Sequence, residues 1–377
     1  MTYKKTRTGC THCKDRKVKC DENVPCTACV RRNSTCSLEA QGRSPRNQPQ
    51  SPRNTTTTQV VFVSHLQRIA PSPSDGLTTQ DRELLTHWHK VASKAITDQP
   101  GTDDLWQYEV THLAFDHPVI LNLALALSSF ERAHTAHLSK TDVSAHRRRR
   151  DIYASLGFSY SRNAVGLMRD AVANANRNNG PLCHLASVLM MINSYAEGSA
   201  KELVRGDNDY PSMLNDLMVT CRLTRGVRAI ADTFGVIRPD RREKMLFVTE
   251  VEPPDHGPLD PLLGVLDSLM FLDQEHDQCI RQTCQDALDL MKWLVRKAQT
   301  SEMWPAHRAS LQWACLVSKE FMGLLEAREP AALVLLSYGC FLADDVSNSF
   351  IMMGWKEGVC AEIRDIVGPR WSWAVAG

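Results

Sequence analysis

From about residue 76 to the C-terminus, apolar residues recur at intervals of three and four positions. Leu214, Leu217, Met218 and Cys221 show this spacing, which places them on one face of an α-helix. Strand-type alternation of Val, Ile and Thr with polar residues is scarce. The pattern predicts helices over 79–95, 118–138, 143–174, 182–196, 211–232, 258–298, 305–328, 330–346 and 354–366. Residues 76–377 are therefore predicted to form a large all-α region, either one domain or two tightly joined helical bundles.

Prolines support several of these boundaries. Pro118, Pro211, Pro305 and Pro330 each stand at a predicted helix start, where the missing N–H and fixed φ of proline are tolerated. The longest apolar stretch, 331–343, is interrupted by a serine and a glycine and falls short of the ~20 residues that span a bilayer. We therefore expect a soluble protein with no membrane insertion.

The segment before this domain has a different composition. Residues 39–58 contain almost no large apolar side chains and are rich in Pro, Ser, Gln, Arg and Thr, which predicts a disordered linker over 39–75. The run Val60–Val63 is too short for a zipper, and no heptad pattern is sustained between 39 and 80. A homodimer, if one forms, is expected to assemble through the helical domain.

The first 38 residues carry six cysteines in a duplicated pattern. Cys-x2-Cys-x6-Cys occurs twice, with an offset of 16 residues, at Cys10, Cys13, Cys20, Cys26, Cys29 and Cys36. A structural zinc ion takes four ligands in a tetrahedron. Two tetrahedra that share an edge need six donors, so six cysteines predict a binuclear cluster with two Zn2+ per chain and two bridging thiolates.

Other interpretations of the cysteines explain less. A disulfide framework needs an oxidising compartment, and Met1 is followed by a charged stretch with no apolar signal segment. A single site formed by the two Cys-x2-Cys pairs leaves Cys20 and Cys36 without a role at matched positions. A redox pair accounts for only two of the six, and His12, inside the first pair, is interpreted as an exposed loop residue.

Positive charge is concentrated in the same region. Of the chain's 44 basic and 43 acidic residues, 12 basic and 4 acidic lie in residues 1–55, which leaves 32 basic and 39 acidic in the rest. Four cations lie between the second and third cysteine, and two more follow the fifth; they are Lys14, Arg16, Lys17, Lys19, Arg31 and Arg32. A basic, metal-stabilised module on an acidic body is typical of a nucleic-acid-binding protein.

Residues 10–36 resemble the fungal Zn(2)-C6 binuclear-cluster transcription factors, and the resemblance includes Lys14, Arg16, Lys17, Lys19, Asp21 and Pro25. The resemblance implies that Cys10 and Cys26 bridge the two zinc ions, and that a short helix after Cys13 enters the major groove of double-stranded DNA. It implies that Arg16 and Lys17 read a CGG-type triplet, whose guanines present two acceptors each. We assign Lys14, Lys19, Arg31 and Arg32 to phosphates. Nuclear localisation is expected.

The helical domain is similar to the sterol-uptake-control subgroup of these factors, in blocks at 83–88, 105–106, 113–118, 223–227 and 368–373. The subgroup implies an all-α domain, which in its sterol-binding members holds a small hydrophobic ligand. Many similar proteins regulate secondary-metabolite gene clusters. We therefore expect a regulator of RNA polymerase II genes for a metabolite pathway, with a lipid- or sterol-responsive regulator as the alternative.

The remaining patterns indicate less. The run Arg147–Arg150 is interpreted as either a nuclear-import signal or a solvated helix face. Seven further cysteines, scattered through predicted helices, are interpreted as buried apolar residues: Cys183, Cys221, Cys279, Cys284, Cys315, Cys340 and Cys360. No phosphate loop, dinucleotide fingerprint or Gly-x-Ser-x-Gly occurs, so the chain is not expected to be an enzyme.

Overall fold

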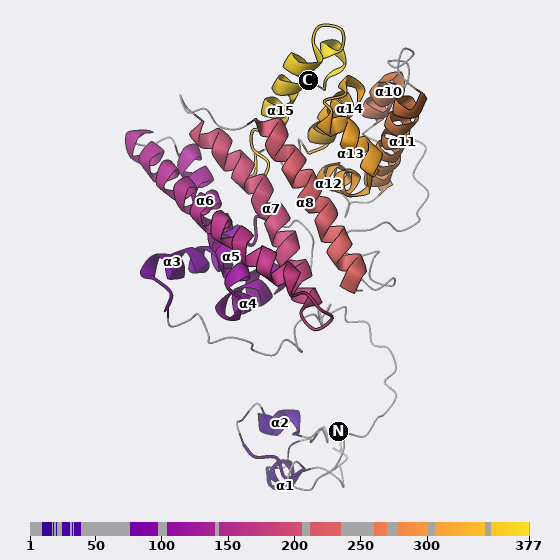
Figure 1. The fold of residues 1–377 in the computed structure, drawn as a ribbon. Helices are drawn as coiled ribbons and strands as arrows, with labels where there is room; N and C mark the ends of the chain where they lie inside the picture. The colour runs from indigo at the N-terminus through magenta and orange to yellow at the C-terminus, as the bar shows by residue number, and fades with distance from the viewer. Residues whose placement is uncertain are drawn as a thin grey trace. The chain divides into compact units, whose positions relative to one another are not determined.

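The structure is a computed structural model, and it divides the chain into two compact units, Met1–Thr58 and Gln59–Gly377 (Figure 1). It describes residues 10–16, 18, 20, 25–30, 32, 34–38, 76–96, 104–139, 143–205, 212–234, 260–269, 278–300, 306–343 and 348–376. The predicted linker 39–75 lies outside these residues. We call the first unit the zinc module and the second the helical body, and each is described by itself.

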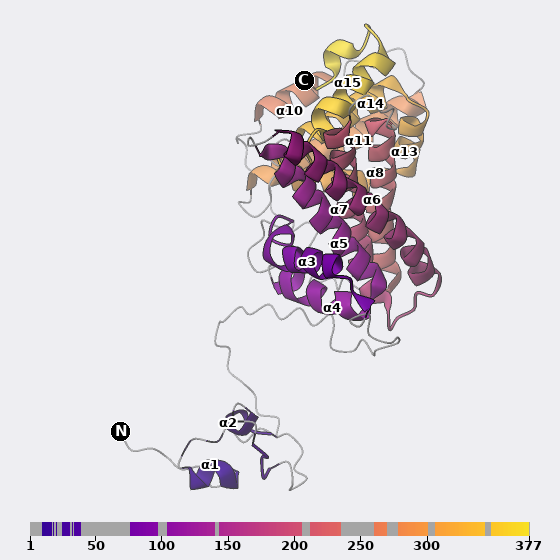
Figure 2. The same ribbon diagram turned by 90° about the vertical axis from the view of Figure 1, so that its left-hand side faces the viewer.

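The helical body begins with short helices that pack against the first of three long ones. Thr78 caps the first helix, where its hydroxyl accepts from the Asp81 N–H and its own N–H donates to the Asp81 carboxylate. The elements in this half are α3 (Thr79–His87), the π-helical turns Trp88–Ala92 and Asp104–Glu109, α4 (Val110–Asp116), α5 (Pro118–Leu138), α6 (Val143–Ala173) and α7 (Gly180–Val204). Helix α5 packs along α6 and also contacts α7 (Figures 1 and 2).

The second half continues the helical packing. Its elements are α8 (Met213–Phe234), α10 (Asp260–Ser268), α11 (Gln278–Thr300), α12 (Ala306–Leu316), α13 (Lys319–Glu326), α14 (Pro330–Phe341), α15 (Trp355–Val367) and a final 3-10 turn, Ser372–Ala374. Helix α8 lies beside α7 and also contacts α12 and α15 (Figure 1). Every regular element among the described residues is helical, which confirms the all-α prediction.

Two apolar cores hold the body together. The first surrounds α5 and contains Trp88, Ile120 and Phe130 among its fully buried side chains. The second is built around α14, in which every residue from Ala331 to Cys340 is buried. A helix that is apolar on all sides must be surrounded by protein or lipid, and here α11, α12, α13 and α15 surround it. Among the described residues, no helix has the length and apolar character needed to cross a bilayer.

Two sequence predictions of long helices are wrong. The predicted helix 258–298 is two helices, α10 and α11, and the predicted helix 305–328 is also two, α12 and α13. The second break occurs because the Ser318 hydroxyl accepts from the Phe321 N–H at 3.0 Å and starts a new helix. The helical segment 104–116 was not predicted. Pro118 and Pro330 stand at their helix starts as predicted, and Pro211 and Pro305 lie outside the described residues.

Candidate metal centre and nucleic-acid interface

The two cysteine repeats of the zinc module form two similar turns. Cys10 is the N-cap of α1 (Thr11–Asp15), and its sulfur accepts from the Cys13 N–H at 3.3 Å. Cys26 directly precedes α2 (Thr27–Val30), and its carbonyl accepts from the Cys29 N–H at 3.0 Å. In each repeat a helical turn therefore brings the second sulfur back beside the first, as the x2 spacing allows.

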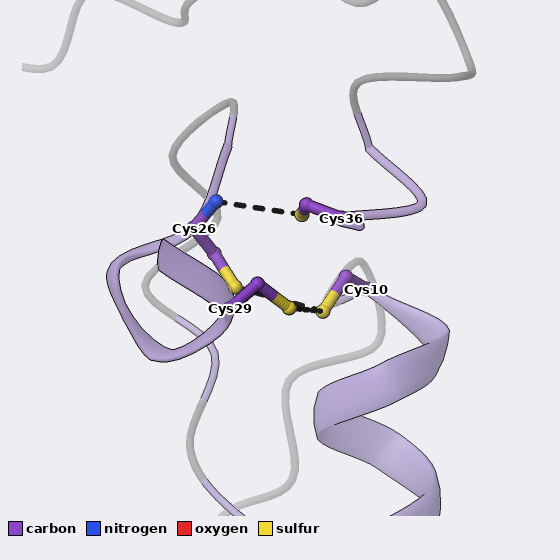
Figure 3. A group of neighbouring side chains, drawn as sticks. All are labelled: Cys10, Cys26, Cys29 and Cys36. Atoms are coloured by element: carbon purple, nitrogen blue, oxygen red, sulfur yellow. Dashed lines mark hydrogen bonds between the residues drawn. The ribbon is translucent and has the colours of Figure 1, made fainter. Parts of the chain in front are cut away.

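The six sulfurs converge in two groups of four, and Figure 3 shows one of them, Cys10, Cys26, Cys29 and Cys36. Cys10, Cys13, Cys20 and Cys26 form one group, and Cys10, Cys26, Cys29 and Cys36 form the other; within each, all sulfurs lie within 4.8 Å of one another. The Cys10–Cys26 and Cys13–Cys26 Sγ–Sγ distances are 3.6 Å, and the Cys10–Cys29 distance is 3.7 Å. A tetrahedron with Zn–S bonds of ~2.3 Å has edges of about 3.8 Å, so these separations suit zinc.

Cys10 and Cys26 are the two residues that both groups share. Two tetrahedra with a common edge use six ligands in this way, with the shared sulfurs bridging the metals. In each group a backbone N–H also donates to one of the sulfurs. The Cys10 N–H donates to Cys20 Sγ at 3.3 Å, and the Cys26 N–H donates to Cys36 Sγ at 3.4 Å. The donor set therefore fits a binuclear zinc cluster.

The buried sulfurs need positive charge nearby if they are to be ionised. All six cysteines are at most 3% exposed. Burial raises the pKa of the Cys10 and Cys13 thiols, because a thiolate in this setting loses its hydration. Two divalent cations would offset four of the six negative charges of the ionised sulfurs. Apart from the sulfurs, the buried apolar core of the described module is Leu38, with Ala28 packed against it.

The predicted DNA-contacting residues are only partly described. Lys14 and Arg16 lie on or at the end of α1, and both are exposed, as is Arg32. Lys17, Lys19 and Arg31 lie outside the described residues. The helix expected after Cys13 in fact begins at Thr11, because Cys10 caps it. His12 is exposed and belongs to neither sulfur group, but it lies on this helix rather than in a loop.

One contact in the zinc module was not predicted. The Thr11 N–H donates to the Ser37 hydroxyl at 2.8 Å, so the start of α1 is joined to the residue after the last cysteine. An N-terminal helical N–H without an intrahelical acceptor needs such a partner. The bond joins the two repeats beside the sulfurs. The spacing of cysteines gave no signal for it, because a serine in a turn is common.

In the helical body, the seven other cysteines follow the prediction with two exceptions. Five are buried, but Cys279 is exposed and Cys315 is half-buried, so the interpretation of all seven as buried residues is wrong for these two. Burial raises the pKa of Cys221 to about 12 and that of Cys360 to about 11. These thiols are therefore protonated and unreactive at neutral pH.

Comparison with known proteins agrees with the geometry. Residues 8–45 match the fungal Zn(2)-Cys(6) binuclear cluster domain. A Zn(2)-C6 fungal-type transcription factor of Gibberella zeae is 23% identical over 91% of this chain and 77% of its own length. The Zn(2)-C6 fungal-type transcription factor afumD of Aspergillus fumigatus is 24% identical over 89% of this chain and 84% of its own length. Sterol uptake control protein 2 of Candida albicans is 27% identical, over 33% of this chain and 15% of its own length.

Proposed function

We propose that this chain, whose N-terminal unit is a fungal Zn(2)-Cys(6) domain that binds two zinc ions, is a sequence-specific DNA-binding transcription factor. The observation that supports this most directly is the pair of four-sulfur groups sharing Cys10 and Cys26, with exposed Lys14 and Arg16 on the adjoining helix. Zinc supplies the fold of the module rather than any reaction, because six protein sulfurs fill all eight coordination positions of two tetrahedra. The protein is not proposed to be an enzyme.

The contact roles follow from the chemistry of the side chains. Cys10, Cys13, Cys20, Cys26, Cys29 and Cys36 hold the two zinc ions. Arg16 and Lys17 donate to guanine O6 and N7 in the major groove, which carries the preference for CGG-type half-sites. Lys14, Lys19, Arg31 and Arg32 contact phosphates, which hold the module in register without reading sequence.

A selection experiment tests this function. Full-length protein is incubated with randomised duplexes in zinc-containing buffer, and the bound fraction is sequenced. We expect enrichment of a CGG-type triplet, and loss of that enrichment after zinc is chelated. If zinc-loaded protein enriches no sequence, the proposed function is wrong.

We further propose that the protein acts in the nucleus on RNA polymerase II genes of a secondary-metabolite pathway. Similarity over about nine-tenths of the chain to two fungal transcription factors of comparable length supports a regulator of this size and layout. A genome-wide binding map in the source organism tests the pathway. Binding that avoids biosynthetic gene clusters would contradict it.

The second candidate is a lipid- or sterol-responsive regulator. It is favoured by similarity to the sterol uptake control proteins of Candida albicans and Saccharomyces cerevisiae, the latter covering 54% of this chain. Under this function the helical body binds a small hydrophobic ligand. Mass spectrometry of an organic extract of purified full-length protein should detect the ligand, and a clean extract from protein purified from its native host would count against it.

We also propose that any homodimer forms through the helical body. Sedimentation of full-length protein on duplexes carrying one or two half-sites tests this. Two chains bound to each duplex would indicate a dimer held together by the protein itself, whereas two chains on the two-site duplex and one on the one-site duplex would indicate independent monomers. One chain on both duplexes would rule out the dimer.

A further inference from the structure

The outer surface of α6 carries a row of arginines with no partner in the described part of the body. Arg147, Arg148, Arg162 and Arg169 are all exposed, and none forms an ion pair with a described residue. The opposite side of the helix is buried against α5 and α7, where Gly157 lies so close to Phe130 that a Cβ there would be 2.3 Å from the ring. Helix α6 lies at the left of the body in Figure 1 and across the side that faces the viewer in Figure 2. We call these four residues the arginine face.

The helix geometry aligns these arginines. At about 100° per residue, Arg148, Arg162 and Arg169 point within a sector of about 60°, with Arg147 beside its edge. At ~1.5 Å per residue, Arg148 and Arg169 are about 32 Å apart along the axis. The arginine face is therefore a long, straight, basic row rather than a cluster.

Acidic residues do not cancel this charge. Asp151 is exposed on the same side, but its carboxylate accepts from Arg150 Nε at 2.8 Å and forms an ion pair with Arg150 Nη2 at 2.7 Å. Asp170 is the other acidic residue of α6. Four arginines thus face solvent beside one unpaired carboxylate, in a region of the chain that otherwise has more acidic than basic residues. The arginine face is a local exception, and it is complementary to a polyanion.

The length of the row matches duplex DNA. One helical turn of B-DNA rises about 34–36 Å, so a straight helix with arginines about 32 Å apart can meet phosphates on both sides of one groove. The 37 residues from 39 to 75 lie between the described parts of the module and the body, and at ~3.6 Å per residue they cannot extend beyond about 130 Å. When the module is on DNA, the body is therefore held at high effective concentration near the same duplex.

We propose that the arginine face of α6 binds the phosphate backbone of the duplex that flanks the site read by the zinc module. This rests on the proposed DNA-binding function and adds a second contact to it. The contact is sequence-independent, because guanidinium groups on phosphates read no bases. It lengthens the footprint and steepens the salt dependence of binding, and it leaves base preference unchanged.

The test compares charge-matched double variants of full-length protein. R162Q/R169Q removes two arginines from the arginine face outside the Arg147–Arg150 run, R147Q/R148Q removes the other two, and R281Q/R296Q removes two exposed arginines from α11. Affinity is measured between about 50 and 200 mM salt. One duplex of about 50 base pairs exceeds four turns, and another of about 12 base pairs offers roughly one turn around the triplet.

On the long duplex, each arginine-face variant should lower the slope of log K against log salt by about 1.8, at ~0.9 per phosphate contact. The slope should be unchanged on the short duplex and in R281Q/R296Q. Equal slopes for R162Q/R169Q and wild type on the long duplex would overturn the proposal. So would an equal loss in R281Q/R296Q, which would indicate a general charge effect.

Two further measurements distinguish this proposal from the proposed triplet recognition and from a role of the arginines in nuclear import. A long duplex without the triplet should show the same slope differences, so the arginine face is tested even if the triplet preference fails. The nuclear fraction of fluorescently tagged protein is measured in parallel. If R147Q/R148Q leaves the nucleus while both arginine-face variants keep the wild-type slope, Arg147 and Arg148 serve an import carrier and the DNA contact is wrong.

Discussion

The zinc module and the helical body bury different materials. In the described module, the buried side chains are six cysteines and Leu38, whereas the body buries two large apolar clusters that include Trp88, Trp313 and Trp355. Apolar burial stabilises the body by many small increments. A segment of about forty residues has too little apolar surface to fold by that route. The comparison indicates that one unit depends on a single binding event and the other on distributed packing.

Removal of zinc should have the largest effect and should break only one of the two units. Metal binding and folding are one event in a domain held by its ligands. Chelation is therefore expected to abolish amide protection across residues 10–38 and to leave protection in α5, α7 and α14 unchanged. Hydrogen exchange with mass spectrometry measures both in one sample. Persistent protection of the module without zinc would contradict this.

Substitution of a cysteine shared by both four-sulfur groups should remove more zinc than substitution of a cysteine that belongs to one group. Cys26→Ser alters a sulfur that belongs to both four-sulfur groups, whereas Cys36→Ser alters one that belongs to a single group. We expect Cys26→Ser to lose both zinc ions and Cys36→Ser to retain about one, as measured by metal analysis of purified protein. One zinc per wild-type chain would exclude the binuclear cluster.

A substitution in the apolar core should destabilise the body and leave the zinc module unchanged. A Cβ on Gly198 would lie 2.1 Å from the Trp355 ring, which is fixed by its indole N–H bond to the Tyr195 carbonyl at 3.0 Å. Gly198→Ala should therefore destabilise the body by about 1–3 kcal/mol. Zinc content should not change. The midpoint of urea unfolding, followed by tryptophan fluorescence, gives the measurement.

Gly226→Ala is the matched control, since a Cβ there meets nothing within 4 Å and the residue also lies inside a helix. It should stabilise the body by about 0.5–1 kcal/mol, because alanine loses less backbone entropy than glycine. A loss of stability in both variants would show that the Trp355 contact is not the cause.

Within the module, substitution of a residue that contacts bases and substitution of a residue that contacts phosphates should affect DNA binding differently. Arg16→Ala should weaken binding to the preferred duplex by about 1–3 kcal/mol and relax the preference for guanine. Lys14→Ala should weaken all duplexes alike and lower the salt slope by roughly one unit. Competition titrations with matched and mutated triplets distinguish them. An unchanged triplet preference in Arg16→Ala would show that the assignment of Arg16 as a base reader is wrong.

The sequence predicted the module better than the body for a physical reason. Ligand chemistry fixes the number and spacing of cysteines, so the convergence of the six sulfurs on two metals could be predicted from their spacing alone. The Thr11–Ser37 bond could not, because a turn serine has many roles. In the body, periodicity located α5, α6 and α14 to within a few residues at most boundaries. Periodicity does not reveal where one helix ends and the next begins when the apolar pattern continues through both.

Contacts between residues far apart in the sequence could not be predicted either, because periodicity is a local signal. The Glu362 carboxylate of α15 accepts from the Met213 N–H at 2.7 Å and the Leu214 N–H at 3.3 Å, and so caps α8 from about 150 positions away. The C-terminal segment is held by the Ala376 N–H bond to the Ser337 hydroxyl at 3.0 Å. Such partners follow from the packing of α14 and α15, which local propensity does not encode.

The smallest destabilisation should come from loss of the cap that divides α12 from α13. Ser318 is exposed, and its hydroxyl satisfies the Phe321 N–H at the first turn of α13. Ser318→Ala should cost about 1 kcal/mol of body stability. Ser318→Asp should retain it, since a carboxylate caps equally well and suits the positive end of the helix. Urea midpoints of the two variants give the comparison, with zinc content unchanged in both. If the alanine variant matched wild type, water would serve Phe321 N–H as well as serine does, and packing of Phe321 alone would set the break.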